Sequence, residues 1–296
     1  MTYSIVARDG NTGHMGVAVQ SHWFSTGSVV TWAEAGVGAV ATQAFAEPSY
    51  GPRGLDLMRR GLTAGEALEA LAQVDPGVAR RQVAMVDVRG AVGIHTGELC
   101  IAEAGHVIGD GFSVQANMML RDTVPAAMAS AFTRADGDLA QRMIAALEAA
   151  EDEGGDIRGK QSAALLVVRG EVATDPADGR VLELRVPDHP EPLAELRRLL
   201  VVRRAYDRMN AGDVLLGEDD MEGALHEYEA AQAAVPDNVE FAFWCGVTLA
   251  SVGKVDEARS FMARAFEGEG DWRELLRRLP DVGVLPQDAA EALLGD

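Results

Sequence analysis

Thr2 follows the initiator methionine, and its type and position could supply a nucleophile. Methionine aminopeptidase normally removes Met1 before a small residue such as threonine, which leaves an α-amine beside a hydroxyl. An α-amine with a pKa of about 7.7 to 8 can act as general base for that hydroxyl. The chemistry expected of Thr2 is therefore attack on a carbonyl, as in amide hydrolysis. Threonine is also common after the initiator in proteins without this activity, and a retained Met1 would favour a binding protein.

A second hydroxyl is expected close to Thr2. Residues 3–21 predict a hairpin, because two strand-like segments flank a stretch rich in turn formers. A register that pairs Arg8 with Met15 sets Thr2 opposite Ser21. The sequence therefore predicts a threonine and a serine side by side at the open end of this hairpin.

His22 follows Ser21 and has two interpretations. Its neighbours Trp23 and Phe24 make a packed or substrate-lining histidine as reasonable as a catalytic one. An enzyme that uses Ser21 or His22 without N-terminal activation is thus a second alternative to the Thr2 mechanism.

Polar residues that precede an apolar strand form the next candidate group. Gly154 and Gly155 allow close backbone approach, and four polar candidates follow: Asp156, Arg158, Gln161 and Ser162. They could hold the α-amine and bind a substrate carboxylate through Arg158, or form a buried ion pair that fastens a loop.

Asn117, at the end of a predicted strand, carries an amide that could stabilise an oxyanion. A structural cap or turn role suits it equally. Tyr50 and Arg53 lie in a loop with two prolines, 47–53, where arginine could bind a carboxylate and tyrosine offers an apolar face with a polar tip. The alternative for that loop is a conformational lock.

Short strands and helices must position these residues, and they predict an α+β sandwich. The helices expected before residue 154 are a short turn over 54–61, a helix over 67–74 opened by a Thr63–Glu66 capping box, and two stretches in 123–153 split at Gly137. The expected strands are 3–8, 15–21, 37–44, 82–88, 91–96, 112–117, 162–169 and 181–186. Glycine-bearing segments 10–13 and 105–111 are expected to be turns, without the lysine or spacing of a nucleotide site.

The pattern changes near residue 200, which is the expected boundary between domains 1–200 and 201–296. A helix over 190–202 leads out of the first domain, and small and apolar positions then recur every 34 residues. Segments 205–238 and 239–272 resemble two tetratricopeptide repeats. Two repeats are fewer than the roughly three that are stable alone, so we expect self-association, docking or a protein partner for this all-α domain.

Composition excludes several classes of function. The 296 residues include 26 basic and 46 acidic side chains, a net charge of −20 that disfavours nucleic acid and anionic membrane surfaces. Cys100 and Cys245 stand alone, and no two of the six histidines have helical ligand spacing. We therefore expect no metal, no cofactor and no membrane partner. Without a signal peptide or an apolar membrane segment, a cytoplasmic location is expected.

Five blocks together resemble a known family. They are 2–9 (TYSIVARD), 36–44 (GVGAVATQA), 48–55 (PSYGPRGL), 114–117 (VQAN) and 155–164 (GDIRGKQSAA). In this order they are similar to domain-of-unknown-function family 1028 of bacteria and archaea, over roughly residues 2–200. The resemblance implies the four-layer αββα fold of N-terminal nucleophile hydrolases.

The sequence thus favours hydrolysis of a small amide or peptide-like substrate. In this interpretation Thr2 attacks, its α-amine moves the proton, and Asn117 stabilises the oxyanion. The main alternative is a non-catalytic scaffold that keeps the fold and binds a protein through its repeats.

Overall fold

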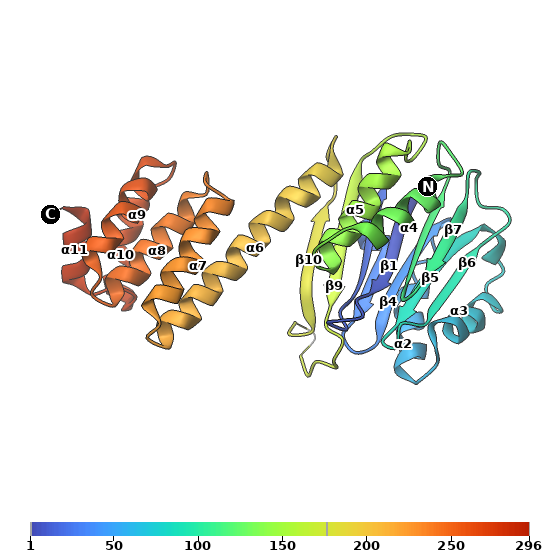
Figure 1. The fold of residues 1–296 in the computed structure, drawn as a ribbon, viewed down its shortest axis with the longest axis horizontal. Helices are drawn as coiled ribbons and strands as arrows, with labels where there is room; N and C mark the ends of the chain where they lie inside the picture. The colour runs from blue at the N-terminus through green and yellow to red at the C-terminus, as the bar shows by residue number, and fades with distance from the viewer. Residues whose placement is uncertain (1, 176, 296) are drawn as a thin grey trace. The chain divides into compact units, whose positions relative to one another are not determined.

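A computed structural model describes residues 2–175 and 177–295 of the chain. The structure is a mixed α+β protein of two compact units, which divide between Arg197 and Arg198. Figure 1 shows the strands in the first unit and helices alone in the second, with helix α6 (Pro192–Gly217) carrying residues of both. Met1, whose removal the Thr2 mechanism requires, lies outside the described residues.

Two antiparallel sheets form the centre of the first unit. Among the described residues, the six-stranded sheet has the order β10-β9-β2-β1-β8-β7 and the four-stranded sheet the order β3-β4-β5-β6. The strands are β1 (Thr2–Arg8), β2 (Met15–Ser21), β3 (Thr31–Glu34), β4 (Gly38–Ala44), β5 (Arg81–Asp87), β6 (Val92–Thr96), β7 (Gly105–Gly109), β8 (Phe112–Asn117), β9 (Ser162–Val168) and β10 (Arg180–Val186).

Side-chain alternation along the strands explains how the sheets pack. On β4, Ala39 and Ala41 join a buried cluster with Val6 of β1 and Val17 of β2, so they face the larger sheet. Val40, between the two alanines, belongs instead to a cluster with helical residues. Because successive strand residues point to opposite faces, each of these strands is apolar on both faces.

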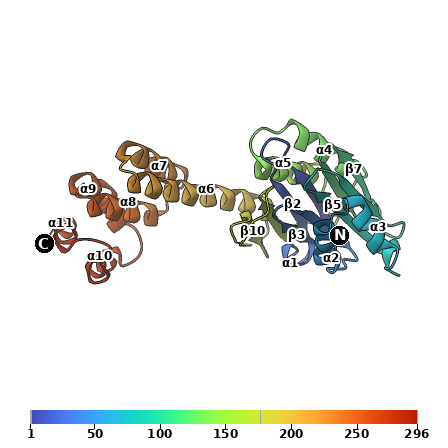
Figure 2. The ribbon, with the colours of Figure 1, turned by 90° about the horizontal axis from the view of Figure 1, so that it is seen from below.

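Two pairs of helices cover the sheets. Helices α4 (Val124–Arg134) and α5 (Leu139–Asp152) contact strands of the larger sheet, whereas α2 (Tyr50–Arg59) and α3 (Ala64–Ala72) contact strands of the smaller one. Figure 2 shows the strands between α4 and α5 on one side and α2 on the other. The short helix α1 (Gly27–Val30) connects β2 to β3, and the short helix η1 (Val78–Arg80) lies between α3 and β5.

The predicted N-terminal hairpin is confirmed in its register. Arg8 pairs with Met15, and the ladder runs to Tyr3 opposite Gln20. Tyr3 points away from the second sheet, and its hydroxyl donates to Glu151 of α5 at 2.5 Å. Thr2, one residue earlier, therefore faces the space between the two sheets.

Local signals placed several helices correctly. The Thr63–Glu66 capping box is present at the start of α3, and α4 and α5 are separated around Gly137, whose φ is +99°. That value lies in the region that glycine adopts without steric cost. The signal in each case is a short-range one that needs no distant partner.

Other predicted boundaries were wrong. The turn expected over 54–61 is a ten-residue helix that begins at Tyr50, and part of the segment expected as a turn over 105–111 is strand β7. Within the described residues, strand β7 pairs only with β8, and its burial alternates between half-buried and exposed. An edge strand of this kind lacks the apolar run that marks the central strands.

The second unit is helical throughout its described part. The helix expected over 190–202 is longer, because α6 continues to Gly217. The helices that follow α6 are α7 (Met221–Ala234), α8 (Val239–Ser251), α9 (Val255–Glu267), α10 (Trp272–Arg278), η2 (Pro280–Val282) and α11 (Gln287–Leu294).

One close contact recurs in this unit with the period seen in the sequence. A Cβ at Gly212 would lie 2.3 Å from Tyr228, and a Cβ at Gly246 would lie 2.8 Å from Met262. Both glycines are therefore required by helix packing at equivalent positions 34 residues apart. Within the described residues, no helix is long and apolar enough to cross a membrane.

Candidate functional site

Thr2 opens strand β1, which lies between β2 and β8 in the larger sheet. Its side chain is almost wholly buried, with 4% of the residue exposed. The Thr2 hydroxyl donates to Ser21 Oγ at 3.1 Å, as the hairpin register predicts. Sequence reasoning thus placed these two hydroxyls side by side.

Asn117 of β8 is the residue paired with Thr2 across the ladder. Its Nδ2 donates to Thr2 O at 3.3 Å and to Gln82 Oε1 at 2.9 Å. An amide nitrogen carries two protons, and this arrangement directs both into the protein. Asn117 therefore holds the backbone of Thr2, and the expected oxyanion role lacks a spare N–H here.

Two glutamines of the smaller sheet reach across to the same place. Gln43 Nε2 lies 3.3 Å from Thr2 O, 2.7 Å from Gln82 Oε1 and 3.4 Å from Gln115 O. Gln82 Nε2 donates to Ala116 O at 2.9 Å. Both side chains are fully buried, where polar groups require partners. They tie the start of β1 to β4 and β5.

Ser4 extends this network one step along β1. Its hydroxyl donates to Gln43 Oε1 at 2.6 Å and accepts from Gln115 Nε2 at 2.6 Å. Gln115 Oε1 in turn accepts from Ser113 Oγ at 3.0 Å. Because each of these groups is buried, the network fixes the backbone around Thr2 in one arrangement.

Thr2 lies in the wall of a cavity of about 550 Å³. This volume falls within the range of small-molecule sites, about 300 to 1,000 Å³. The walls are mostly apolar, and of the predicted site residues they include Thr2, Ser21, Asn117 and Arg158. The lining is completed by Trp23, Thr26, Val29, Val30, Ala44, Phe45, Ala46, Arg81 and Ile101.

Asp156 and Arg158 form an ion pair beside this cavity. Asp156 has a fully buried carboxylate, and Arg158 donates to it from Nε at 3.1 Å and from Nη2 at 2.8 Å. The same carboxylate accepts from the backbone N–H of His22 at 3.2 Å. The pair thus fastens the loop after α5 to the end of β2.

The hydrogen bonds of Ser162 hold the backbone of a neighbouring segment, and His22 lies outside the lining of the cavity. Ser162 Oγ donates to Trp23 O at 2.5 Å and accepts from Thr26 N at 3.0 Å, so it holds the segment after β2. The imidazole Nδ1 of His22 is buried and has no hydrogen-bond partner among the described residues. His22 is not among the residues that line the cavity.

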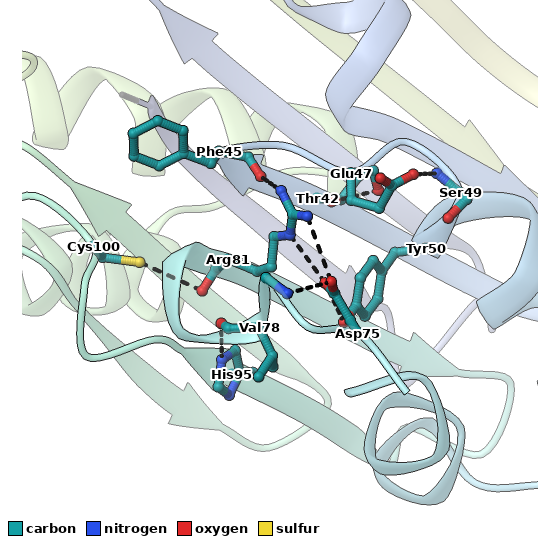
Figure 3. A network of polar contacts seen from close by, with 11 residues as sticks. Thr42, Phe45, Glu47, Ser49, Tyr50, Asp75, Val78, Arg81, His95 and Cys100 are labelled. Atoms are coloured by element: carbon teal, nitrogen blue, oxygen red, sulfur yellow. Dashed lines mark hydrogen bonds and ion pairs between the residues drawn. The ribbon is translucent and has the colours of Figure 1, made fainter. Parts of the chain in front are cut away.

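Arg81 is a cavity residue that sequence reasoning missed (Figure 3). Its Nε donates to Asp75 Oδ2 at 2.9 Å, and its Nη1 donates to Phe45 O. Asp75 also accepts from Tyr50 Oη at 3.1 Å. The Arg81 guanidinium holds the pKa of the Asp75 carboxyl below its usual value. Burial and the Asp75 carboxylate raise the pKa of Tyr50.

The structure does not bring Tyr50, Arg53 and Gln161 to the Thr2 cavity. Tyr50 and Arg53 line a separate hollow of about 210 Å³, because α2 begins at Tyr50 and carries both side chains away from β1. Gln161 donates at the surface to Asp188 at 3.2 Å. For Tyr50, the conformational-lock alternative fits the buried hydroxyl and its bond to Asp75.

Two other missed residues, Gln43 and Gln82, had a signal in the sequence. They stand in strands that are mostly apolar, VGAVATQA and QVAMVDV. A glutamine in such a strand must find buried partners, which marks an interior polar cluster. Their pairing across two sheets could not be read from either strand alone.

No group of three or more His, Cys, Asp or Glu side chains within residues 2–175 and 177–295 is arranged to hold a metal ion. The polar side chains that line the cavity are those of Thr2, Ser21, Thr26, Arg81, Asn117 and Arg158. Cys100, next to the Arg81 network in Figure 3, is half-buried, and burial raises the pKa of its thiol.

Comparisons with known proteins identify the family. The model of a family of unknown function, DUF1028, matches residues 2–196. A crystal structure of protein SPO2555 from Silicibacter pomeroyi, assigned to the same family, has 31% sequence identity and a TM-score of 0.61. The match covers 67% of this chain and 84% of that chain.

A second solved structure is more distant. Anbu (ancestral beta-subunit) from Yersinia bercovieri has 12% identity and a TM-score of 0.32, over 67% of this chain and 92% of that chain. No curated protein matches. On the family match and the 31% identical structure, this chain belongs to the DUF1028 family, as the five sequence blocks indicated.

Proposed function

We propose that this protein is an amide hydrolase with Thr2 as its N-terminal nucleophile. The observation that carries the proposal is the position of Thr2: its hydroxyl lies in the wall of a 550 Å³ cavity and its carbonyl accepts from Asn117 and Gln43. A network that fixes the backbone of the first mature residue positions both its hydroxyl and its α-amine. This geometry is what a self-activating nucleophile requires.

The fold supports the same proposal. The contacts of one helix pair with each sheet and the apolar cluster shared by the two sheets support a four-layer αββα sandwich, the arrangement of N-terminal nucleophile hydrolases. Removal of Met1 would then leave the Thr2 amine at the start of an inner strand. Strand β1 has neighbours on both sides in its sheet, so this end is held rigidly.

The oxyanion donor that we assign is the backbone N–H of Ala46. Asn117 commits its amide protons elsewhere, whereas Ala46 lines the cavity and its N–H donates to no acceptor among the described residues. The chain turns sharply just before it, because Ala44 has a φ of +68°. Arg81 secures the turn through its bond to Phe45 O. Backbone N–H groups held in this way stabilise developing negative charge.

The proposed reaction has two stages, acylation of Thr2 and hydrolysis of the resulting ester. Thr2 Oγ1 bonds to the substrate carbonyl carbon while its proton passes to the α-amine. The C–N bond breaks as that proton moves to the leaving amine, and a threonyl ester remains. Water then attacks the ester, gives its proton to the α-amine, and releases the carboxylic acid as Thr2 Oγ1 recovers a proton.

The helical unit has a separate proposed role. Its repeated glycine contacts at Gly212 and Gly246 support two tetratricopeptide-like repeats that bind a protein or a second copy of the chain. In that case the helical unit recruits a partner, and chemistry is confined to the first unit.

The deciding experiment combines mass and activity. The intact mass of the untagged protein shows whether Met1 is removed, and a panel of anilides is then tested with wild type, Thr2→Ala and Thr2→Ser. Thr133→Ala is a matched control, since that threonine lies exposed on α4 and its hydroxyl donates to Ala129 O. We expect activity in wild type and Thr133→Ala, reduced activity in Thr2→Ser, and none in Thr2→Ala. A processed Thr2→Ala protein with full activity would refute the mechanism, and a retained Met1 would favour a binding role.

A further inference from the structure

The wall of the Thr2 cavity is dominated by hydrocarbon. Three large apolar side chains in it remain substantially exposed: Trp23 at 62%, Phe45 at 50% and Ile101 at 44%. Val29 and Val30 complete the apolar surface. Contiguous exposed apolar groups of this size mark a surface that gains free energy when a ligand covers it.

The two arginines among the described residues of the wall are already neutralised by the protein. Arg158 uses its Nε and Nη2 on Asp156, and Arg81 uses its Nε and Nη2 on Asp75. Nε and one Nη form the fork that binds a carboxylate in a bidentate manner. Each guanidinium therefore presents its main carboxylate-binding edge to its own aspartate.

The net charge of the chain also disfavours an anionic substrate. The chain carries a net charge of −20, which lowers the local concentration of anions. A carboxylate entering the cavity would lose its hydration and find both arginines paired, a combination that is costly in an apolar site. The sequence-based expectation that Arg158 binds a substrate carboxylate is not supported by this geometry.

We infer that the Thr2 cavity binds the uncharged, apolar acyl group of its amide substrate. The inference rests on the proposed function for the position of the scissile bond, and it names the substrate class: N-acyl amides with an aliphatic or aromatic acyl chain. The apolar walls bind the acyl chain and the amide carbonyl lies at Thr2.

A series of p-nitroanilides tests this directly. Hexanoyl and glutaryl p-nitroanilide share the first carbons of the acyl chain and differ in a terminal ethyl group against a carboxylate. For wild type we expect kcat/KM to rise about fourfold per methylene from acetyl to hexanoyl, and to be at least about tenfold higher for hexanoyl than for glutaryl. Equal or higher kcat/KM for glutaryl would overturn the inference.

Binding separates this inference from the mechanism. Calorimetry on Thr2→Ala protein measures the affinity of both anilides whether or not Thr2 is catalytic, and hexanoyl is expected to bind at least about tenfold more tightly. Ile101→Asn should reduce that preference, whereas Ile108→Asn, an exposed change on β7 outside the cavity, should leave it intact. If Thr2→Ala kept full turnover and still bound hexanoyl p-nitroanilide more tightly than glutaryl p-nitroanilide, the mechanism would be refuted and the substrate class would stand. Equal binding of both anilides by Thr2→Ala would remove the substrate class.

Discussion

Replacement of Arg81 by methionine should loosen the cavity wall that carries Phe45 and Ala46. Methionine keeps most of the hydrocarbon stem but removes the charge and every donor. Asp75 then loses its cation, and Phe45 O loses its donor. The side chains of Arg81 and Asp75 are only 18% and 12% exposed, so water cannot fully replace the lost partner.

The magnitude follows from that burial. Removing one partner of a fully buried ion pair costs about 3 to 5 kcal/mol, and partial exposure of this pair lowers the expected cost to about 2 kcal/mol. In the double variant Arg81→Met/Asp75→Asn the uncompensated charge is absent, and the amide oxygen can still accept from Gly77 N. We expect the double variant to lose only about 1 kcal/mol, near the value of one hydrogen bond.

Hydrogen exchange of the β4 and β5 amides measures this opening locally. At pH 7 the single variant should exchange about 30-fold faster than wild type and the double variant about fivefold faster. Because the pKa of Asp75 is lowered in the fold, its contribution is present above the unfolded pKa of about 4 and is lost as the pH falls through the lower, folded value. The difference between wild type and Arg81→Met should therefore shrink below about pH 4. Equal exchange in the single and double variants would refute the account based on an unpaired carboxylate.

Three further changes test other parts of the structure. Ala46→Pro removes the assigned oxyanion donor and should lower kcat by about 10² to 10³, whereas Ala46→Gly keeps the N–H and should retain most activity. Gln20→Leu should raise the free energy of unfolding by about 1 kcal/mol, because both amide atoms of Gln20 are buried without a partner among the described residues. Its melting temperature should therefore rise, and a lower melting temperature would contradict this. Gly51→Ala should cost about 1 to 3 kcal/mol in a thermal melt, since its Cβ would lie 2.2 Å from Trp32, while Gly10→Ala, with open space around it, should change little.

Features set by neighbouring residues could be predicted from the sequence. The hairpin register depends on one turn, and it places Thr2 beside Ser21. The capping box at Thr63 and the break at Gly137 depend on a few adjacent residues. In each case the deciding interaction spans fewer than about twenty positions, so a single sequence contains the necessary information.

Features set by packing between distant strands could not be predicted. Asn117 was expected to face an oxyanion, but the ladder with β1 turns its amide toward Thr2 O. Tyr50 was expected near the site, but its helix starts earlier than the loop composition suggests. The sequence does not indicate that Arg81 lines the cavity, because its position there depends on its bonds to Asp75 and to Phe45 O.

The layer between the two sheets explains why the site lies at one end of the fold. Toward the far end that layer is apolar, with Val6, Val17 and Val86 in one buried cluster. Toward the start of β1 the same strand faces carry Ser4, Gln43 and the rest of the polar network. A network of this kind contributes little net stability compared with apolar residues of the same size. Its specific effect is to hold one backbone carbonyl, that of Thr2, with donors from both sheets. This placement of donors around the Thr2 carbonyl supports the proposed role of Thr2 as an N-terminal nucleophile.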